Sequence, residues 1–217
     1  MQIHNLSESN SVMNHFLAEI RHIDVQKDSM RFRRNIERIG EIMGYEISKI
    51  LPYESVDIPT PLGTKATTKI KDPIVVCSIL RAGLTLHNGF LNCFDGAENG
   101  FISAYRHHPN QDEYFEILVE YQAIAEVDQK NVLLVDPMLA TGQSIVAVYK
   151  KILEQKNPTS VHIAVVIAAP EGIAYLEQHL PNTCHLWIGA VDEKLNEKSY
   201  IVPGLGDAGD LAYGVKL

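Results

Sequence analysis

The stretch NVLLVDPMLATGQS, residues 131–144, joins an apolar run to a loop of small residues. The run 131–136 is rich in β-branched and other apolar residues, a pattern typical of a strand that is buried on both faces. Asp136 ends this run. Because ligands bind beyond the carboxyl ends of strands in open α/β sheets, we expect its carboxylate to point into a crevice.

The residues that follow, ATGQS at 140–144, predict the start of a helix. Free N–H groups at a helix N-terminus, together with the helix dipole, bind phosphate. Thr141 and Ser144 can add hydroxyl donors, and Gly142 removes a side chain where an anion would approach. Ordinary capping by Ser or Thr gives the same pattern, so this loop alone does not decide between the two. It is not a Walker loop, because GxxxxGK[ST] is absent.

Similar runs recur on both sides of this stretch and alternate with helical patterns. Further strands are expected at 74–80, 101–106, 114–121, 161–169 and 184–191, and helices near 84–94, 143–156 and 171–179. This alternation predicts an α/β fold with a mostly parallel twisted sheet flanked by helices. No repeat or linker interrupts it, so we expect a single domain over residues 1–217.

The N-terminal part predicts two helices. One covers 12–22, and the other begins after a capping Asp28 or Ser29. The apolar positions of the second helix are Phe32, Ile36, Ile39, Met43, Ile47 and Ile50. Gly40 and Gly44 lie one turn apart on it, which indicates close packing, because each costs about 1 kcal/mol relative to Ala.

Four arginines lie near the start of this second helix, at positions 31, 33, 34 and 38. Basic residues are unfavourable at the positive end of a helix dipole, so they either form a solvated basic face or contact a partner. Residues 56–70, rich in Thr, Pro and Gly, predict an exposed β-arm with a turn near 61–64. A protruding arm usually needs a partner subunit to cover its edges, so a homo-oligomer is expected.

The composition narrows the class of function. The chain of 217 residues carries a formal net charge of −8, which disfavours general nucleic-acid binding but allows a local site for an anionic small molecule. The three cysteines show no CxxC spacing, which argues against a zinc site. No apolar run approaches the ~18 residues of a membrane span, and the first residues do not resemble a signal peptide. We therefore expect a cytoplasmic protein.

Two further loops carry candidate chemistry. In ILRAGL, 79–84, Arg81 follows a buried strand, and its guanidinium suits bidentate phosphate binding, although a structural ion pair is the alternative. In YIVPGLGDAGD, 200–210, the spacing GxGxxG is misleading, because too few residues follow for a dinucleotide-binding unit. We interpret it as an irregular glycine-rich loop that presents backbone groups to a small planar ligand. Arg106 is a possible second phosphate cation.

These loops offer anion binders, one acid at a strand end and a backbone-rich pocket, but no obvious nucleophile. Such a set suits transfer of a phosphorylated sugar, in which an enzyme positions reactants and stabilises charge. The motifs ILRAGL, VDPMLATGQS, AAPEGI (168–173) and YIVPGLGDAGD occur in this order. With RFR (31–33) and AYR (104–106), they cover most of the chain and resemble the uracil phosphoribosyltransferases.

The resemblance implies a type I phosphoribosyltransferase fold, with a hood made by the chain's terminal parts over the base. It implies the reaction of uracil with phosphoribosyl pyrophosphate (PRPP) to give UMP and diphosphate. Arg81 and Arg106 would contact PRPP, Asp136 would hold the ribose hydroxyls, and Asp207 would face the diphosphate and its Mg²⁺. The 5′-phosphate would be wrapped by Pro137, Met138, Leu139, Ala140, Thr141, Gly142, Gln143 and Ser144. Uracil would be read by backbone groups of Ile201, Gly206, Asp207 and Ala208.

Two departures from the family pattern matter. Gln143 stands where the family usually has a second glycine, which would be costly if that position needs a positive φ. Leu211 stands where many members have a basic residue.

Asp136 is followed by Pro137 rather than by a second acid, as in the uracil enzymes. Mg²⁺ is therefore expected to arrive mainly on PRPP, without a dedicated protein metal site.

Three alternatives remain open at this stage. A nucleotide-sensing, RNA-binding regulator can share the fold, because a fold does not determine function. A phosphoribosyltransferase for another base is the second alternative. The third concerns regulation, since some relatives are activated by GTP.

Overall fold

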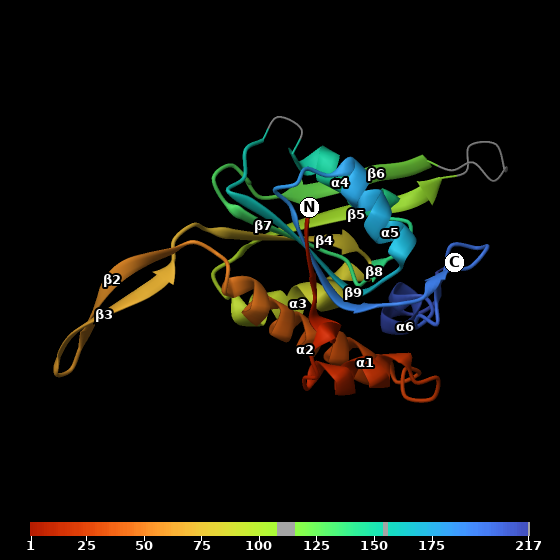
Figure 1. Ribbon diagram of the computed structural model, residues 1–217, viewed down its shortest axis with the longest axis horizontal. Helices are drawn as coiled ribbons and strands as arrows, with labels where there is room; N and C mark the ends of the chain where they lie inside the picture. Colours follow the sequence, from red (N-terminus) through yellow and green to blue (C-terminus); the bar gives the residue numbers. More distant parts are fainter. Residues whose placement is uncertain (108–115, 154–155, 217) are drawn as a thin grey trace.

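The computed structural model describes the backbone of residues 1–107, 116–153 and 156–216, and the side chains of these residues other than 105–107, 116–117 and 153. A central sheet has the strand order β1-β10-β9-β7-β4-β5-β6, with β8 also paired to β9 (Figure 1). Its strands are β1 (Gln2–Asn5), β4 (Ile74–Leu80), β5 (Glu98–His107), β6 (Glu116–Ile124), β7 (Asn131–Val135), β8 (Met138–Leu139), β9 (Ser160–Ala168) and β10 (His185–Val191).

All pairings in this sheet are parallel except that of β6, which runs antiparallel to β5 at one edge. The expected mostly parallel α/β sheet is therefore confirmed. The additional strand expected at 114–121 is β6, although residues 114 and 115 lie outside the described part. At the opposite edge, β1 was not predicted, because three of its four residues, QIHN, are polar.

Helices cover both faces of the sheet. They are α1 (Met13–Arg21), α2 (Ser29–Ser48), α3 (Gly83–Cys93), α4 (Gln143–Leu153), α5 (Pro170–His179) and α6 (Ala208–Tyr213). Figure 1 shows α1, α2 and α3 on one side and α4 and α5 on the other. Strand β7 illustrates how the sequence builds these layers, because successive side chains point to opposite faces. Leu133 and Val135 join the core under α2 and α3, whereas Val132 and Leu134 join the core under α4 and α5.

Helix α2 begins as the sequence predicts. The Asp28 carboxylate accepts hydrogen bonds from the N–H groups of Met30 and Arg31, at 3.0 and 3.1 Å. Five of the six expected apolar positions are buried, but Ile50 is 45% exposed because the helix ends at Ser48. A Cβ added to Gly40 would lie 2.8 Å from the carbonyl oxygen of Leu86 in α3, so the predicted close packing is confirmed.

The β-arm consists of β2 (Tyr53–Thr60) and β3 (Gly63–Ile70), which pair with each other in a sheet of their own. Figure 1 shows the arm extending away from the rest of the molecule. Leu62, in the turn at its tip, is fully exposed. Residues 56–70 therefore form the hairpin that the sequence predicts, lengthened by three residues at the start.

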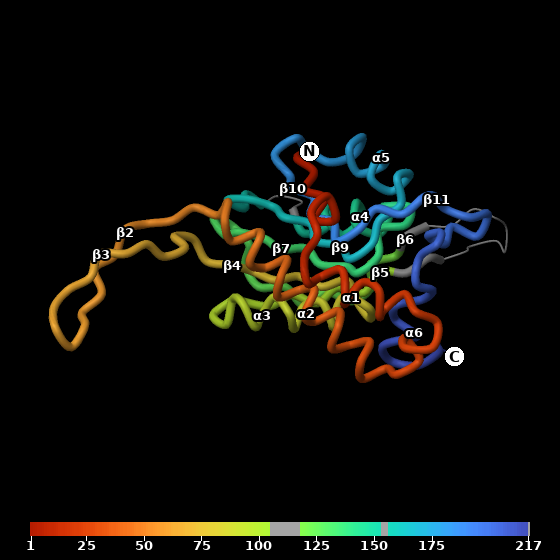
Figure 2. The backbone as a smooth tube through the Cα atoms, turned by 60° about the horizontal axis from the view of Figure 1, so that its bottom comes forward, coloured from red at the N-terminus to blue at the C-terminus, as the bar shows by residue number. Residues whose placement is uncertain are grey.

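The C-terminal part is more regular than expected. A small hairpin of β11 (Lys194–Leu195) and β12 (Ile201–Val202) precedes the glycine loop, and the loop leads into α6. Gly209, the last glycine of the GxGxxG spacing, lies inside this six-residue helix. The expectation of a wholly irregular loop was therefore wrong. Both views place α6 beside α1 and α2, so segments from the two ends of the chain lie together (Figure 2).

Candidate active site

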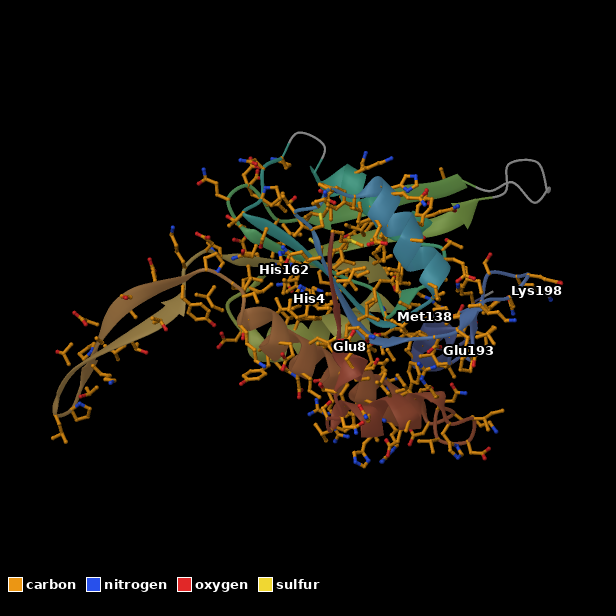
Figure 3. The ribbon with its side chains drawn as sticks, in the orientation of Figure 1. His4, Glu8, Met138, His162, Glu193 and Lys198 are labelled. Carbon is orange, nitrogen blue, oxygen red and sulfur yellow. The ribbon has the colours of Figure 1, made fainter. Side chains whose placement is uncertain are left out.

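A cavity of about 700 Å³ lies beyond the carboxyl ends of β4 and β7. Five segments separated in the sequence contribute to it: the end of β4 with the loop after it, Ala104 in β5, the loop after β7, the β11–β12 hairpin and the C-terminal segment. Eight predicted site residues line it, namely Arg81, Asp136, Met138, Ala140, Thr141, Gly142, Ser144 and Asp207. In Figure 3, the labelled Met138 lies near the end of the sheet and Lys198 at the tip of the hairpin.

Six other predicted residues do not line the cavity. Pro137 uses its carbonyl to accept hydrogen bonds from the N–H groups of Val166 and Ile167, and Leu139 is fully buried. Gln143, Ile201, Gly206 and Ala208 complete this group. Ile201 and Ala208 are buried as whole residues, at 5% and 3% exposure, and both belong to the hydrophobic core. Arg106 lies in β5, but its side chain lies outside the described residues.

Asp136 directly follows β7, is partly buried and lines the cavity. Burial raises the pKa of its carboxyl to about 7, and the hydrogen bond from the Met138 N–H, at 3.3 Å, opposes this shift. Its own N–H is used by the carbonyl of Ala164, at 3.1 Å. The carboxylate therefore retains oxygen lone pairs for a ligand, and its charge changes near neutral pH.

The loop at 140–144 reaches the first turn of α4, as the sequence predicts. Gly142 has a φ of +80°, which favours glycine, and a Cβ there would lie 3.0 Å from the carbonyl oxygen of Gly172. Gln143 is the first residue of α4 and so has helical backbone geometry. Position 143 therefore does not need a positive φ, and in this loop the positive φ occurs at Gly142.

Helix α5 supports this loop from behind, which gives the AAPEGI motif a structural reason. A Cβ added to Gly172 would lie only 2.2 Å from the carbonyl oxygen of Ala140, so the first turn of α5 touches the loop backbone. The Glu171 carboxylate also accepts a hydrogen bond from the N–H of Leu195, at 2.9 Å. One short helix start therefore holds both the 140–144 loop and the β11–β12 hairpin.

Arg81 lies in the loop after β4, where the Leu80–Arg81 peptide bond is cis. Its guanidinium donates to the Asp210 carboxylate at 2.8 Å and to the Gly214 carbonyl at 3.2 Å. The next glycine, Gly83, packs closely, because a Cβ there would lie 2.8 Å from the carbonyl oxygen of Val135. The loop is therefore pressed against the end of β7, and Arg81 faces the same cavity as Asp136.

Asp207 caps α6. Its Oδ1 accepts a hydrogen bond from the N–H of Asp210 at 2.9 Å, and its Oδ2 lies 3.9 Å from the Nζ of Lys216. The same carboxylate lines the cavity, so it can serve the helix with one oxygen and a ligand with the other.

Comparison with known proteins places this geometry in a family. The family model for uracil phosphoribosyltransferase matches residues 7–215. The chain belongs to the uracil phosphoribosyltransferase family.

The similarity to individual relatives extends over all or nearly all of the chain. It is 46% identical to the uracil phosphoribosyltransferase of Porphyromonas gingivalis over 217 residues, covering 100% of both chains. It is 36% identical to that of Thermococcus gammatolerans, covering 99% of this chain and 94% of the relative. A solved structure of a protein from Aquifex aeolicus superposes with a TM-score of 0.88 at 32% identity, covering 100% of each chain.

More distant structures share only the fold. A hypoxanthine phosphoribosyltransferase structure from Staphylococcus aureus superposes with a TM-score of 0.52 at 13% identity, covering 75% of this chain and 76% of that one. The type I phosphoribosyltransferase fold implied by the sequence is thus confirmed, and the recognition of the family from its motifs is confirmed as well.

Four polar residues of this family member's cavity were missed by the sequence analysis. Lys198, Ser199 and Tyr200 come from the β11–β12 hairpin, and Lys216 comes from the C-terminal segment. Ser199 has a φ of +61°, which no sequence pattern around it indicated. The described lining residues include three cations (Arg81, Lys198, Lys216) and two carboxylates. The cavity is therefore locally positive although the whole chain carries a net charge of −8, and it suits an anionic ligand.

The arginines at the start of α2 are already engaged within the chain. Arg31 forms an ion pair with Glu19, Arg34 pairs with Glu37 and Glu41, and Arg33 donates to the carbonyl of Ala212. Arg38 lies 5.2 Å from the ring centre of Phe16. The carboxylates of Glu19, Glu37 and Glu41 therefore offset the charges of Arg31 and Arg34, which weakens this face as a binding site for the phosphates of an RNA.

Among the described residues, no group of three or more His, Cys, Asp or Glu side chains is arranged to hold a metal ion. The cavity carboxylates Asp136 and Asp207 nevertheless fit Mg²⁺ that comes with a diphosphate, because this ion commonly uses one or two carboxylates plus phosphate oxygens. In the part of the chain that the structure describes, no helix has the length and apolarity to cross a membrane.

Proposed function

We propose that this chain is an enzyme that transfers the phosphoribosyl group of PRPP to uracil, forming UMP and diphosphate for pyrimidine salvage. Full-length relatives at 34–46% identity support this activity. The observation that carries it is geometric. Loops after β4 and β7, the hairpin and α6 line one cavity, whose 700 Å³ suits a phosphorylated sugar with a base.

The loop after β7 binds the 5′-phosphate and the ribose in this proposal. The first N–H groups of α4 lack partners within the helix, so they and the hydroxyls of Thr141 and Ser144 can donate to the phosphate oxygens. Asp136 accepts hydrogen bonds from the ribose hydroxyls. Both contacts are supported by the fact that Asp136, Thr141 and Ser144 all line the cavity.

The remaining loops hold the diphosphate and the base. Arg81 and Arg106 bind the diphosphate, with Asp207 beside it. Backbone groups of Ile201, Gly206 and Ala208 read uracil. Asp207 and Gly209, which flank Ala208, line the cavity and support placing this segment beside the ligand.

The reaction is a substitution at the anomeric carbon of the ribose. A uracil nitrogen forms the new bond to this carbon as the bond to the diphosphate oxygen breaks, the diphosphate leaves with the bonding electrons, and the nitrogen loses its proton. The sugar passes through an oxocarbenium-like state, so the cationic side chains stabilise the leaving group most as its charge develops. Mg²⁺, carried by PRPP, would add charge stabilisation there when bound.

A substrate panel tests the activity. The purified chain is incubated with PRPP, Mg²⁺ and uracil, hypoxanthine or adenine, with and without GTP, and nucleotides are separated by chromatography. We expect UMP and equimolar diphosphate from uracil only. Nucleotide formation from a purine base but not uracil, or no product under any condition, would refute the proposal.

Three further features belong to the same proposal. The extended β-arm supports self-association through a second copy, because among the described strands its two pair only with each other and leave their outer edges open. GTP remains a candidate activator that the assay above addresses. The three cysteines are unpaired, which supports the expected reducing, cytoplasmic compartment.

A further inference from the structure

A partly buried ion pair joins the end of α1 to the residue after β10. The Arg21 guanidinium binds both oxygens of the Asp192 carboxylate, at 2.5 Å for Nη2 to Oδ1 and 2.8 Å for Nη1 to Oδ2. The Asp192 side chain is 4% exposed and that of Arg21 is 23% exposed. The Arg31–Glu19 pair of α2 is also bidentate, but its side chains are 51% and 31% exposed, so the Arg21–Asp192 pair is the better shielded from water.

The same pair holds the backbone of Gly204. The N–H of Gly204 donates to Oδ2 of Asp192 at 2.8 Å, and Nη1 of Arg21 donates to the Gly204 carbonyl at 3.0 Å. Both main-chain polar groups of this residue are therefore fixed by two charged side chains. Gly204 has a φ of +64°, and a Cβ there would lie 2.2 Å from the carbonyl oxygen of Ile201, so the loop is tightly folded at this point.

A second contact from the N-terminal part acts on the next residue. With its amide nitrogen placed toward the neighbouring carbonyls, Gln26 donates to Leu205 at 2.7 Å and to Ile20 at 3.1 Å. Figure 2 shows the chain after α1 beside the segment that leads into α6, and Figure 3 marks the position of Glu193, which directly follows Asp192. The end of α1, through Arg21, and the segment after it, through Gln26, therefore contact the glycine loop at two successive residues.

Gly204 and Leu205 lie between Ile201 and Gly206, two of the residues whose backbone groups are assigned to the base. We propose that Arg21 and Asp192 are positioning residues for uracil, which hold the glycine loop in the conformation that recognises the base. This inference rests on the proposed function. Recognition by backbone groups depends on where the loop lies, because no side chain can adjust to a shifted loop. Loss of the Arg21–Asp192 pair should therefore weaken the binding of uracil and leave the binding of PRPP by the 136–144 loop unchanged.

Steady-state kinetics with each substrate varied separately test the proposal. Asp192→Asn keeps an acceptor for the Gly204 N–H but removes the charge, and Arg21→Met removes both donors. We expect Arg21→Met to raise KM for uracil by about tenfold or more, with less than about a twofold change in KM for PRPP. Asp192→Asn should show a smaller change in the same direction, because one of its contacts to Gly204 survives.

A double variant separates positioning from stability. Arg21→Met with Asp192→Leu replaces the partly buried pair by apolar side chains of similar volume, a change that often preserves or raises stability. We expect its melting temperature to recover while KM for uracil stays high. Recovery of KM together with stability, or equal changes of KM for both substrates, would overturn the proposal. The matched control is Arg31→Met, which breaks the exposed pair with Glu19 on α1 and should leave both KM values unchanged.

Hydrogen–deuterium exchange gives a readout that does not depend on turnover. Peptides covering 200–210 should exchange faster in Arg21→Met and in the double variant than in the intact chain, while peptides covering 136–146 should not. Unchanged exchange at 200–210 would refute the positioning role even if the intact chain forms no UMP. A failure of the proposed function would instead appear as absence of UMP in the intact chain, whatever the exchange shows.

Discussion

Asp136 is the residue whose chemistry depends most on its surroundings. Its pKa is raised from 3.8 to about 7, so the folded protein holds a proton that the unfolded chain has lost over this range. The contribution of Asp136 to stability therefore falls as pH rises from about 4 to 7 and stays low above it. Ribose binding shows the opposite trend, because the ionised carboxylate is the better acceptor.

For Asp136→Asn, we expect kcat/KM for PRPP to fall about 10- to 100-fold at pH 8, because a hydrogen bond to a charged group contributes about 1.5–3 kcal/mol. The loss should shrink at pH 6, where the native carboxyl is largely protonated. Thermal melts should show the variant gaining stability relative to the native chain from pH 5 to pH 8. A pH-independent ratio of kcat/KM would contradict the assignment of Asp136 to the ribose.

Gln143→Gly tests the departure from the family pattern. Because Gln143 is helical and does not line the cavity, we expect the KM for PRPP to change less than about twofold. The helix should lose up to about 1 kcal/mol, because glycine is a poor helix former. A large gain in PRPP affinity would show instead that the glutamine side chain obstructs the phosphate site.

Residues of the cavity could be predicted from the sequence where neighbouring residues formed a recognisable pattern. Thr141 and Ser144 were predicted because small and hydroxyl residues within a few positions of each other indicate a helix N-terminus with free N–H groups. Lys198 and Lys216 were not, because each is a single charged residue whose approach to the cavity depends on how the hairpin and the C-terminal segment fold back. The side chain of Arg106 lies outside the described residues, so its role stays a prediction.

At the scale of elements, the contact between α5 and the 140–144 loop is the most sensitive to volume. Gly172→Ala would place a Cβ 2.2 Å from the carbonyl oxygen of Ala140, so the loop or the helix must shift. Overpacking of this kind costs about 1–3 kcal/mol, and we expect KM for PRPP to rise by about tenfold as the phosphate loop moves.

Gly96→Ala is the control for this change, because a Cβ at Gly96 meets nothing within 4 Å. It should leave both stability and KM near their native values. Equal kinetics for the two variants would show that α5 does not position the phosphate loop.

Long apolar elements were predictable and short ones were not. β4 and β7 are buried along their length, and continuous β-branched runs identify such strands. β1, β12 and α6 are too short for periodicity to be visible, and they form because neighbouring segments pair with them or cap them. Asp207, for example, caps a helix of six residues that its sequence alone did not indicate.

At the scale of the molecule, strand order could not be predicted from the sequence. Alternation of strands and helices predicts a parallel sheet, but only tertiary packing decides that β4 lies between β7 and β5. The order matters for function, because it brings the ends of β4 and β7 together and so joins Arg81 and Asp136 in one cavity. Local patterns did not predict that Arg81 and Asp136 share one site, and this expectation came from the resemblance to a known family.

The β-arm leads to a prediction about assembly. Val56 pairs with Thr67 and Ser55 with Thr68, so replacing residues 56–67 by Asn-Gly leaves a short hairpin with a compatible turn. Light scattering should give the intact chain at least twice the mass of one chain, and the shortened variant a lower mass. A monomeric intact chain, or no change on shortening, would contradict association through the arm.

The central claim is that one cavity binds PRPP across several loops and transfers its sugar to uracil. Initial rates of UMP formation with uracil, PRPP and Mg²⁺ test it most directly, compared for the intact chain, Arg81→Ala and Asp207→Asn alongside their melting temperatures. The intact chain should form UMP, and each variant should lose about 100-fold or more in kcat/KM. Stability should change little, because the Arg81–Asp210 pair is partly exposed and asparagine also caps helices. Native rates in both variants, or no UMP from the intact chain, would contradict the account.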